Sequence, residues 1–298
     1  MGGRHVSGVS DSHNSSATRR TFLATLGAAT LGLATGRRAF GALDSVVRPQ
    51  TKLPRIGLEL YTVRRAAAAD LAGTLARVAK IGYTEVEFAG YHQHAAAEIR
   101  DMLKANGLTA PAAHVDIAAI QNAPDKTFED ARTIGHEWIV VPSTPSGKHA
   151  TVDDWKGVAE LFNKTAQQVQ AAGFRFGFHN HNEVFRKIGD VTPIDVLMKE
   201  TDPSLVSYEL DVYWVVNGGA DPVDVLTRYP NRFRLMHLKD SMGPPDHKMA
   251  DVGSGTIDFK AVLAHAKGIE HYFVEHDEPP DAFVDVAASY AYLSKLEY

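Results

Sequence analysis

The chain has 298 residues, of which 44% are hydrophobic and 22% are charged, as in ordinary globular proteins. Its formal net charge is -5, and no long basic run follows the first forty residues, so nothing indicates a nucleic-acid-binding protein. The sequence contains no cysteine, which excludes disulfides, thiolate metal sites and a cysteine nucleophile. Any transition-metal site must therefore be built from His, Asp and Glu.

Residues 1–43 have the features of a disordered N-terminus followed by a targeting signal. Arg19 and Arg20 precede a short run of small and apolar residues at 24–34, and small residues suited to cleavage follow at 39–42. The run is too short to span a bilayer comfortably. This arrangement resembles a twin-arginine export signal. It predicts a periplasmic or secreted protein that has no stable insertion in the membrane once the signal is removed.

The region 54–298 alternates between short apolar runs and longer amphipathic stretches. The pattern predicts strands at residues 56–61, 85–88, 110–115, 137–141, 174–179, 206–211, 233–238 and 272–275. Helices are expected at residues 70–81, 95–106, 153–172, 193–200, 222–229, 259–267 and 281–293. We expect the eight strands to alternate with helices, which is typical of parallel strands with helical crossovers. This number of repeats favours a single (β/α)8 TIM barrel as the catalytic domain, and no glycine-rich phosphate motif follows the first strand.

Side chains of the kind that bind metals gather at the ends of the last four predicted strands. These ends read His179-Asn180-His181, Glu209-Leu210-Asp211, His237-Leu238-Lys239-Asp240 and Glu275-His276-Asp277. In such a barrel the carboxyl ends of the strands converge and form the active site. Several buried carboxylates need a positive partner, and a cation is the simplest one. The residue types suit one divalent ion, and Mn²⁺, Mg²⁺, Co²⁺ and Zn²⁺ all stay open.

Six motifs, in order and at strand-end spacing, resemble the sugar phosphate isomerase/epimerase family of xylose-isomerase-like barrels. The resemblance spans residues 54–296, and its motifs are the segments 57–64, 179–181, 210–214, 237–240, 253–259 and 274–277. It implies a divalent metal held at the ends of strands five to eight by His179, Asp211, His237 and Glu275. His181 competes with His179 for the strand-five position, because residues two apart on a strand point the same way.

Further roles are expected around this metal. We expect catalytic roles for His181, Glu275 and Lys239, since an imidazole can act as a base near neutral pH and a lysine can bind a substrate oxygen. Glu87 is expected either to contact the substrate or to support a ligand from behind, and Glu59 lies near the floor or mouth of the pocket. The remaining substrate contacts are expected from His114, Asn180, Trp214 and Arg64.

The strand-five position carries the main departure from the family. Many members have glutamate there, so that two glutamates flank the substrate as acid and base, whereas this chain has His179. The resemblance implies a metal-dependent isomerase or epimerase that removes a proton next to the carbonyl of a sugar or keto-sugar. A lyase or dehydratase acting on a keto-sugar, inosose or keto-glycoside stays open, as does a non-catalytic sugar-binding barrel. The expected partner is a small carbohydrate, and formation of a homo-oligomer stays open.

Overall fold

The structure of the chain is a computed structural model that describes residues 51–145, 147 and 149–298. The arginine pair and the apolar run that predict export lie outside the described residues, so export stays a prediction. None of the helices in the described part of the chain is long and apolar enough to cross a membrane.

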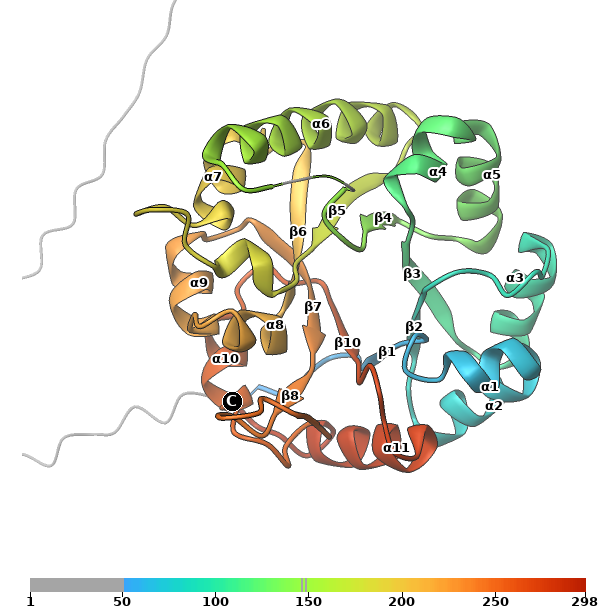
Figure 1. Cartoon of the computed structure of the whole chain (residues 1–298). Helices are drawn as coiled ribbons and strands as arrows, with labels where there is room; N and C mark the ends of the chain where they lie inside the picture. Colours follow the sequence, from blue (N-terminus) through green and yellow to red (C-terminus); the bar gives the residue numbers. More distant parts are fainter. Residues whose placement is uncertain (1–50, 146, 148) are drawn as a thin grey trace, which may run out of the picture. The chain divides into compact units, whose positions relative to one another are not determined.

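Parallel strands close into a barrel whose axis runs toward the viewer in Figure 1. Each strand is hydrogen-bonded to the strands that precede and follow it, and the last pairs with the first. The strands are β1 (Gly57–Glu59), β2 (Glu85–Phe88), β3 (Thr109–His114), β4 (Trp138–Val141), β5 (Arg175–His179), β6 (Val206–Asp211), β7 (Phe233–Leu238) and β10 (His271–Val274). Two short strands in the loop after β7, β8 (Asp240–Ser241) and β9 (Met249–Ala250), pair antiparallel. The predicted (β/α)8 barrel is confirmed.

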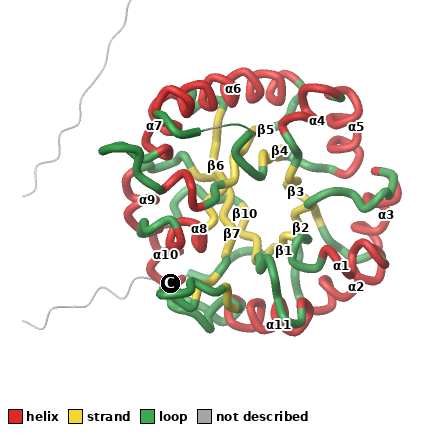
Figure 2. The backbone as a smooth tube through the Cα atoms, viewed as in Figure 1, coloured by secondary structure: helices red, strands yellow, loops and turns green. Residues whose placement is uncertain are grey.

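Figure 2 shows the helices as a ring outside the strands. They are α1 (Arg64–Ala69), α2 (Leu71–Ile81), α3 (Ala96–Ala105), α4 (Ile117–Asn122), α5 (Pro124–Ile134), α6 (Val152–Ala171), η1 (Asn182–Phe185), α7 (Pro193–Glu200), α8 (Val212–Asn217), α9 (Pro222–Arg228), α10 (Phe259–His265) and α11 (Ala282–Leu293). Their apolar faces pack on the outside of the barrel and form the main hydrophobic core.

The structure adds helices that the sequence analysis did not place, namely α1, α4, α5 and α8. Helix α5 begins with Pro124 and ends at Gly135, whose φ of 100° is a left-handed conformation that favours glycine. Its buried residues, Phe128, Ala131 and Ile134, recur at helical spacing. The proline, the glycine and the apolar spacing can all be read from the sequence, so α5 could have been predicted. Helices α1, α4 and α8 have six residues each, too few for a clear hydrophobic period.

The interior of the barrel is closed by an apolar plug. It consists of Ala112, Trp138, Val140, Leu235 and Phe273, all fully buried. A Cβ atom on Gly57 would lie 2.4 Å from the ring of Phe273, so only glycine at this position leaves room for that ring. Because strand side chains point inward at every second position, the inward residues that follow the plug are His114, His237 and Glu275. The plug therefore forms the floor beneath a polar centre.

Candidate metal centre

Four predicted ligands come together at the carboxyl ends of the strands. His179, Asp211 and His237 lie on β5, β6 and β7, and Glu275 directly follows β10. Each offers one ligand atom, and these atoms all lie within 4.8 Å of one another. Nε2 of His179 is 3.3 Å from Oδ2 of Asp211, and Nδ1 of His237 is 3.0 Å from Oε2 of Glu275. All four side chains are buried.

Neighbouring groups orient two of these side chains. Nδ1 of His179 lies 3.1 Å from the carbonyl oxygen of Pro142. A hydrogen on Nδ1 donates to that carbonyl, which leaves the lone pair of Nε2 facing Asp211. Oδ1 of Asp211 accepts a hydrogen bond of 3.0 Å from the backbone N–H of Trp214 and caps α8. Oδ2 of Asp211 therefore stays directed toward the centre.

Asn180 holds the backbone of Asp211. The N–H of Asp211 donates to Oδ1 of Asn180 at 3.1 Å, and Nδ2 of Asn180 donates to the carbonyl of Asp211 at 3.2 Å. These two bonds link the ends of β5 and β6. Two imidazole nitrogens and two carboxylates, buried and oriented in this way, fit a divalent cation.

Lys239 is a second positive partner for the same carboxylates. Its ammonium nitrogen lies 2.6 Å from Asp277, 2.9 Å from Glu275 and 3.3 Å from Asp211. Burial alone would lower the pKa of Lys239, but the charges of Asp211, Glu275 and Asp277 outweigh burial and raise its pKa well above the ordinary value. Lys239 is therefore an ammonium group, suited to donating a hydrogen bond and not to accepting a proton.

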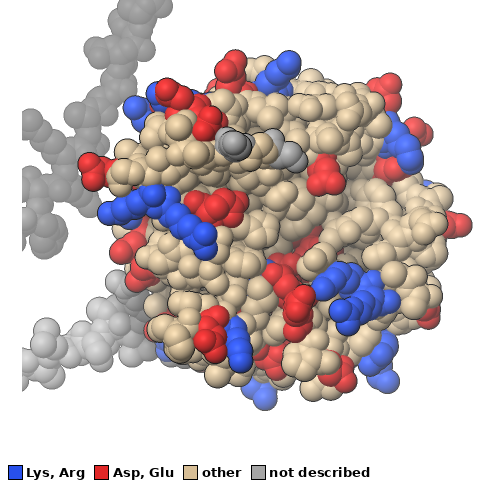
Figure 3. All heavy atoms as spheres, viewed as in Figure 1, with Lys and Arg blue, Asp and Glu red and all other residues tan. Residues whose placement is uncertain are grey.

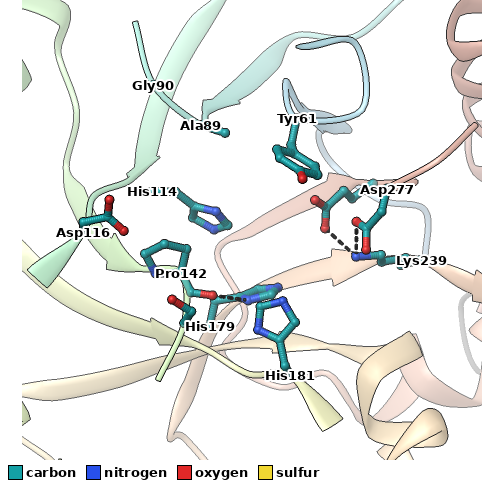
Figure 4. A pocket seen from close by; sticks show the side chains of 12 residues that line it. Tyr61, Ala89, Gly90, His114, Asp116, Pro142, His179, His181, Lys239 and Asp277 are labelled. Carbon is teal, nitrogen blue, oxygen red and sulfur yellow. Dashed lines mark hydrogen bonds and ion pairs between the residues drawn. The ribbon is translucent and has the colours of Figure 1, made fainter. Parts of the chain in front are cut away.

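A cavity of about 390 Å³ opens above these side chains. Figure 4 shows His114, His179 and His181 on one side of it and Lys239 with Asp277 across from them. On the molecular surface the cavity is a hollow near the middle of the face in Figure 3, with acidic side chains beside it. Its lining residues are Tyr61, Ala89, Gly90, His114, Asp116, Pro142, Ser143, His179, His181, Lys239, Glu275 and Asp277.

His181 also lines this cavity. Its side chain forms no hydrogen bond with another described residue, and its ring packs 5.1 Å from the ring of Trp214. Burial, with a smaller contribution from His179, lowers the pKa of His181 to about 3. The imidazole is therefore neutral at pH 7 and has a nitrogen lone pair free. Its expected role as a base stays a prediction.

Below the centre lies a second group of buried ionisable side chains. Nε2 of His237 is 2.7 Å from Glu87 and 3.2 Å from Glu209, and Nε2 of His114 is 2.9 Å from Glu209. Glu59 lies beside Glu87 as its register partner on the adjacent strand. Burial, with the charge of Glu209, raises the pKa of Glu87 to about 8.

The structure corrects two expected substrate contacts. Glu87 is fully buried behind His237 and does not line the cavity, so of its two expected roles the supporting one agrees with the structure. Asn180 is also buried and does not line the cavity, and both ends of its amide form hydrogen bonds with the backbone of Asp211.

Two further expected contacts lie away from the cavity lining. The guanidinium of Arg64 donates to the backbone carbonyls of Tyr61 and Asp277, at 2.8 and 2.7 Å, and therefore ties the loops after β1 and β10 together. It is not among the side chains that line the cavity. Trp214 packs behind His181 and does not line the cavity. His114 does line it, as expected.

The cavity residues without an assigned role in the sequence analysis include Tyr61, Asp116 and Asp277. Asp116 and Asp277 each stand two residues after a side chain that faces the cavity, His114 and Glu275. Because side chains two apart on a strand point the same way, this spacing could have predicted that both aspartates face the cavity. Burial, with the neighbouring charge of Glu275, raises the pKa of Asp277 to about 6 although Lys239 opposes this.

Comparison with known proteins agrees with this architecture. The chain is 29% identical over 127 residues to the inosose dehydratase of Clostridium beijerinckii, covering 37% of this chain and 42% of the relative. It is 26% identical over 158 residues to the inosose dehydratase of Geobacillus kaustophilus, covering 53% and 47%. The chain therefore spans less than half the length of these two curated relatives.

A crystal structure of a sugar phosphate isomerase/epimerase from Parabacteroides distasonis is 28% identical with a TM-score of 0.71, covering 86% of this chain and 97% of that one. Residues 75–285 match the model of the xylose isomerase-like TIM barrel family, and the chain belongs to that family.

Proposed function

We propose that the chain is a divalent-metal-dependent enzyme that removes a proton next to the carbonyl group of a sugar-like substrate. The observation that carries this proposal is the convergence of His179, Asp211, His237 and Glu275. Two of the four, His179 and Glu275, line the cavity. Their donor atoms and their burial support a cation site, and the cavity beside them has room for a small molecule. The intact donor set argues against a barrel that only binds sugars.

Different groups around the cavity are proposed to take different roles in the reaction. A divalent cation, when bound by the four ligands, supplies Lewis acidity toward a substrate oxygen. His181 lines the cavity as a neutral imidazole and is the proposed base, although burial lowers its pKa and makes it a weaker base than a free histidine. Lys239 also lines the cavity, and it can donate a hydrogen bond to a substrate oxygen that displaces one of its carboxylate partners. His114, on the same side as His181, can bind a substrate hydroxyl.

The charges of the cavity favour an uncharged sugar over a phosphorylated one. No arginine lines the cavity in the described part of the chain, and its lysine, Lys239, is already paired with carboxylates. Asp116 and Asp277 also face the cavity and would repel a phosphate group.

Two reaction classes share this first step. In an isomerase or epimerase the proton returns to the substrate, as the similarity to sugar phosphate isomerase/epimerase structures suggests. In a dehydratase a neighbouring hydroxyl group leaves instead, and the similarity to inosose dehydratases favours this second candidate. His179 in the position of a family glutamate also favours elimination, because it removes one of two paired carboxylates.

One experiment tests the shared step and separates the two classes. Metal-loaded protein is incubated in D₂O with a panel of keto-sugars, inososes and keto-glycosides, with Mn²⁺, Mg²⁺, Co²⁺ and Zn²⁺ in parallel, and NMR spectra are followed. Deuterium at the carbon next to the carbonyl supports the proposal. An isomeric product then identifies an isomerase or epimerase, and loss of water or of a glycosyl group identifies a lyase. Binding of a panel member with no exchange by any metal form would identify a sugar-binding barrel instead.

A further inference from the structure

The buried polar layer between the metal centre and the apolar plug is a distinct feature of the barrel. Glu59, Glu87, His114 and His237 each direct one possible ligand atom into a common space, and these atoms lie within 4.8 Å of one another. They come from β1, β2, β3 and β7. Glu59 and Glu87 belong to this layer alone, whereas His237 also faces the metal centre above.

Three carboxylate oxygens of this layer are buried and accept no hydrogen bond from a described residue. Oε2 of Glu59, Oε1 of Glu87 and Oε1 of Glu209 form no hydrogen bond with any described residue. All three glutamates are completely buried. A buried polar atom without a partner is costly, and its presence in a folded protein calls for an occupant that satisfies it.

The charges of the layer also call for a positive occupant. If Glu59, Glu87 and Glu209 were all ionised, even two protonated imidazoles beside them would leave negative charge in excess; a cation or protons on the glutamates would remove that excess. Lys239 does not balance it, because its recorded partners are Asp211, Glu275 and Asp277 in the centre above. The plug of Trp138 and Phe273 closes the barrel below.

The ring of His237 lies between the two layers. Its Nδ1 faces Glu275 and Asp211, at 3.0 and 3.9 Å, and its Nε2 faces Glu87 at 2.7 Å. One ring therefore presents a nitrogen to each layer. His114 belongs to the lower layer and also lines the cavity, which gives a small ion a route from solvent (Figure 4).

We propose that this lower layer is a second divalent-cation site, with Glu59, Glu87 and His114 as ligands and His237 between the two sites. Two carboxylates and an imidazole suit Zn²⁺, Mn²⁺ or Co²⁺. The proposal does not depend on the reaction that the upper site performs. Protons held on the glutamates are the alternative occupant, and the experiment distinguishes the two.

The test counts ions. The full-length protein is stripped with a chelator, reloaded with Zn²⁺ or Mn²⁺, freed of unbound metal and assayed for bound ions per chain by elemental analysis. We expect two ions for the wild type and one for Glu59→Gln, which removes a ligand of the lower site alone. Glu85→Gln is the matched control, because Glu85 is a buried glutamate on β2 that is paired with Arg55 and His271 at the other end of the barrel. It should keep two ions.

If Glu59→Gln does not fold, a second measurement on the wild-type protein still tests the proposal. The wild type loaded with Mn²⁺ should give the exchange-coupled electron paramagnetic resonance spectrum of two neighbouring ions. One ion per chain in the wild type, with the spectrum of isolated Mn²⁺, would overturn the proposal and indicate protons in the lower layer. If that single ion is lost in His179→Ala, the upper site and the proposed function stand while the second site falls.

Discussion

The ammonium nitrogen of Lys239 lies 2.9 Å from Oε2 of Glu275, the same oxygen that lies 3.0 Å from Nδ1 of His237. A second oxygen is shared in the same way, since Oδ2 of Asp211 lies 3.3 Å from Lys239 and 3.3 Å from Nε2 of His179. The lysine and a bound ion therefore draw on the negative charge of the same two carboxylates. We therefore expect binding of the proposed ion to be coupled to the stability that Lys239 contributes.

Replacing this lysine tests the coupling. Lys239→Met should destabilise the metal-free protein by about 3 kcal/mol, because it leaves buried carboxylates without a positive partner. The bound ion supplies that partner, so the loss should be smaller in the loaded protein, and the affinity for the ion should rise. Chemical unfolding with and without chelator, and a metal titration, measure both effects. The exposed Lys248→Met is the control. An equal loss of stability in both forms would refute the coupling.

The two strand-five histidines are expected to separate ion binding from turnover. His179→Ala should lose the ion and the activity together, because Nε2 of His179 faces Asp211. His181→Ala should keep the ion and lower turnover by about 10²–10⁴-fold, as removal of a general base does. Elemental analysis beside single-turnover rates decides between them. Loss of the ion in His181→Ala with full occupancy in His179→Ala would reverse the assignment.

Asn180 should act on the ion through Asp211. Asn180→Ala removes both hydrogen bonds to the backbone of Asp211 and should weaken ion binding about 10–100-fold. Turnover at saturating metal should change little, which distinguishes a positioning residue from a catalytic one. Asn182→Ala, whose amide bonds to Asn217 instead, is the matched control. A loss of turnover that excess metal does not restore would assign Asn180 a direct role.

His136, which lies outside the proposed metal centre, should make the free energy of unfolding depend on pH. Burial lowers the pKa of His136 from 6.5 to about 4 in the folded state. Because the folded pKa is the lower one, the stability held by the neutral ring is complete above pH 6.5 and is lost as the pH falls toward 4. This group alone should lower the free energy of unfolding by about 2 kcal/mol between pH 7 and pH 5.

Unfolding titrations of the wild type and of His136→Gln at both pH values measure that contribution. The variant should lack it, whereas the exposed His265→Gln should behave as the wild type. The same pH dependence in His136→Gln and in the wild type would show that other groups cause it.

Much of the fold could be predicted because local patterns determine it. β6 and β7 have the predicted bounds, since apolar residues recur along each segment and a possible metal ligand stands at or next to its end. Helix α7 was also predicted with its bounds, starting from a proline at its first position. The convergence of His179, Asp211, His237 and Glu275 could be predicted because parallel strands bring their carboxyl ends together.

The remainder depends on relationships between strands that one sequence does not contain. Glu59 lies beside Glu87, and His179 beside Glu209, because of the register between adjacent strands. The lower layer therefore could not be predicted as a unit. Asn180 was expected to face a substrate or the outside, but beyond the end of β5 its side chain turns sideways and binds the next strand.

The most direct test of the account measures ion content beside proton exchange in one preparation. The protein is chelated, reloaded with a divalent ion and assayed in each state for bound metal and for the rate of deuterium entry next to the substrate carbonyl. We predict that exchange is lost with the ion bound by His179, Asp211, His237 and Glu275 and returns when that ion is restored. Full exchange in a preparation shown to contain no metal would contradict the central claim.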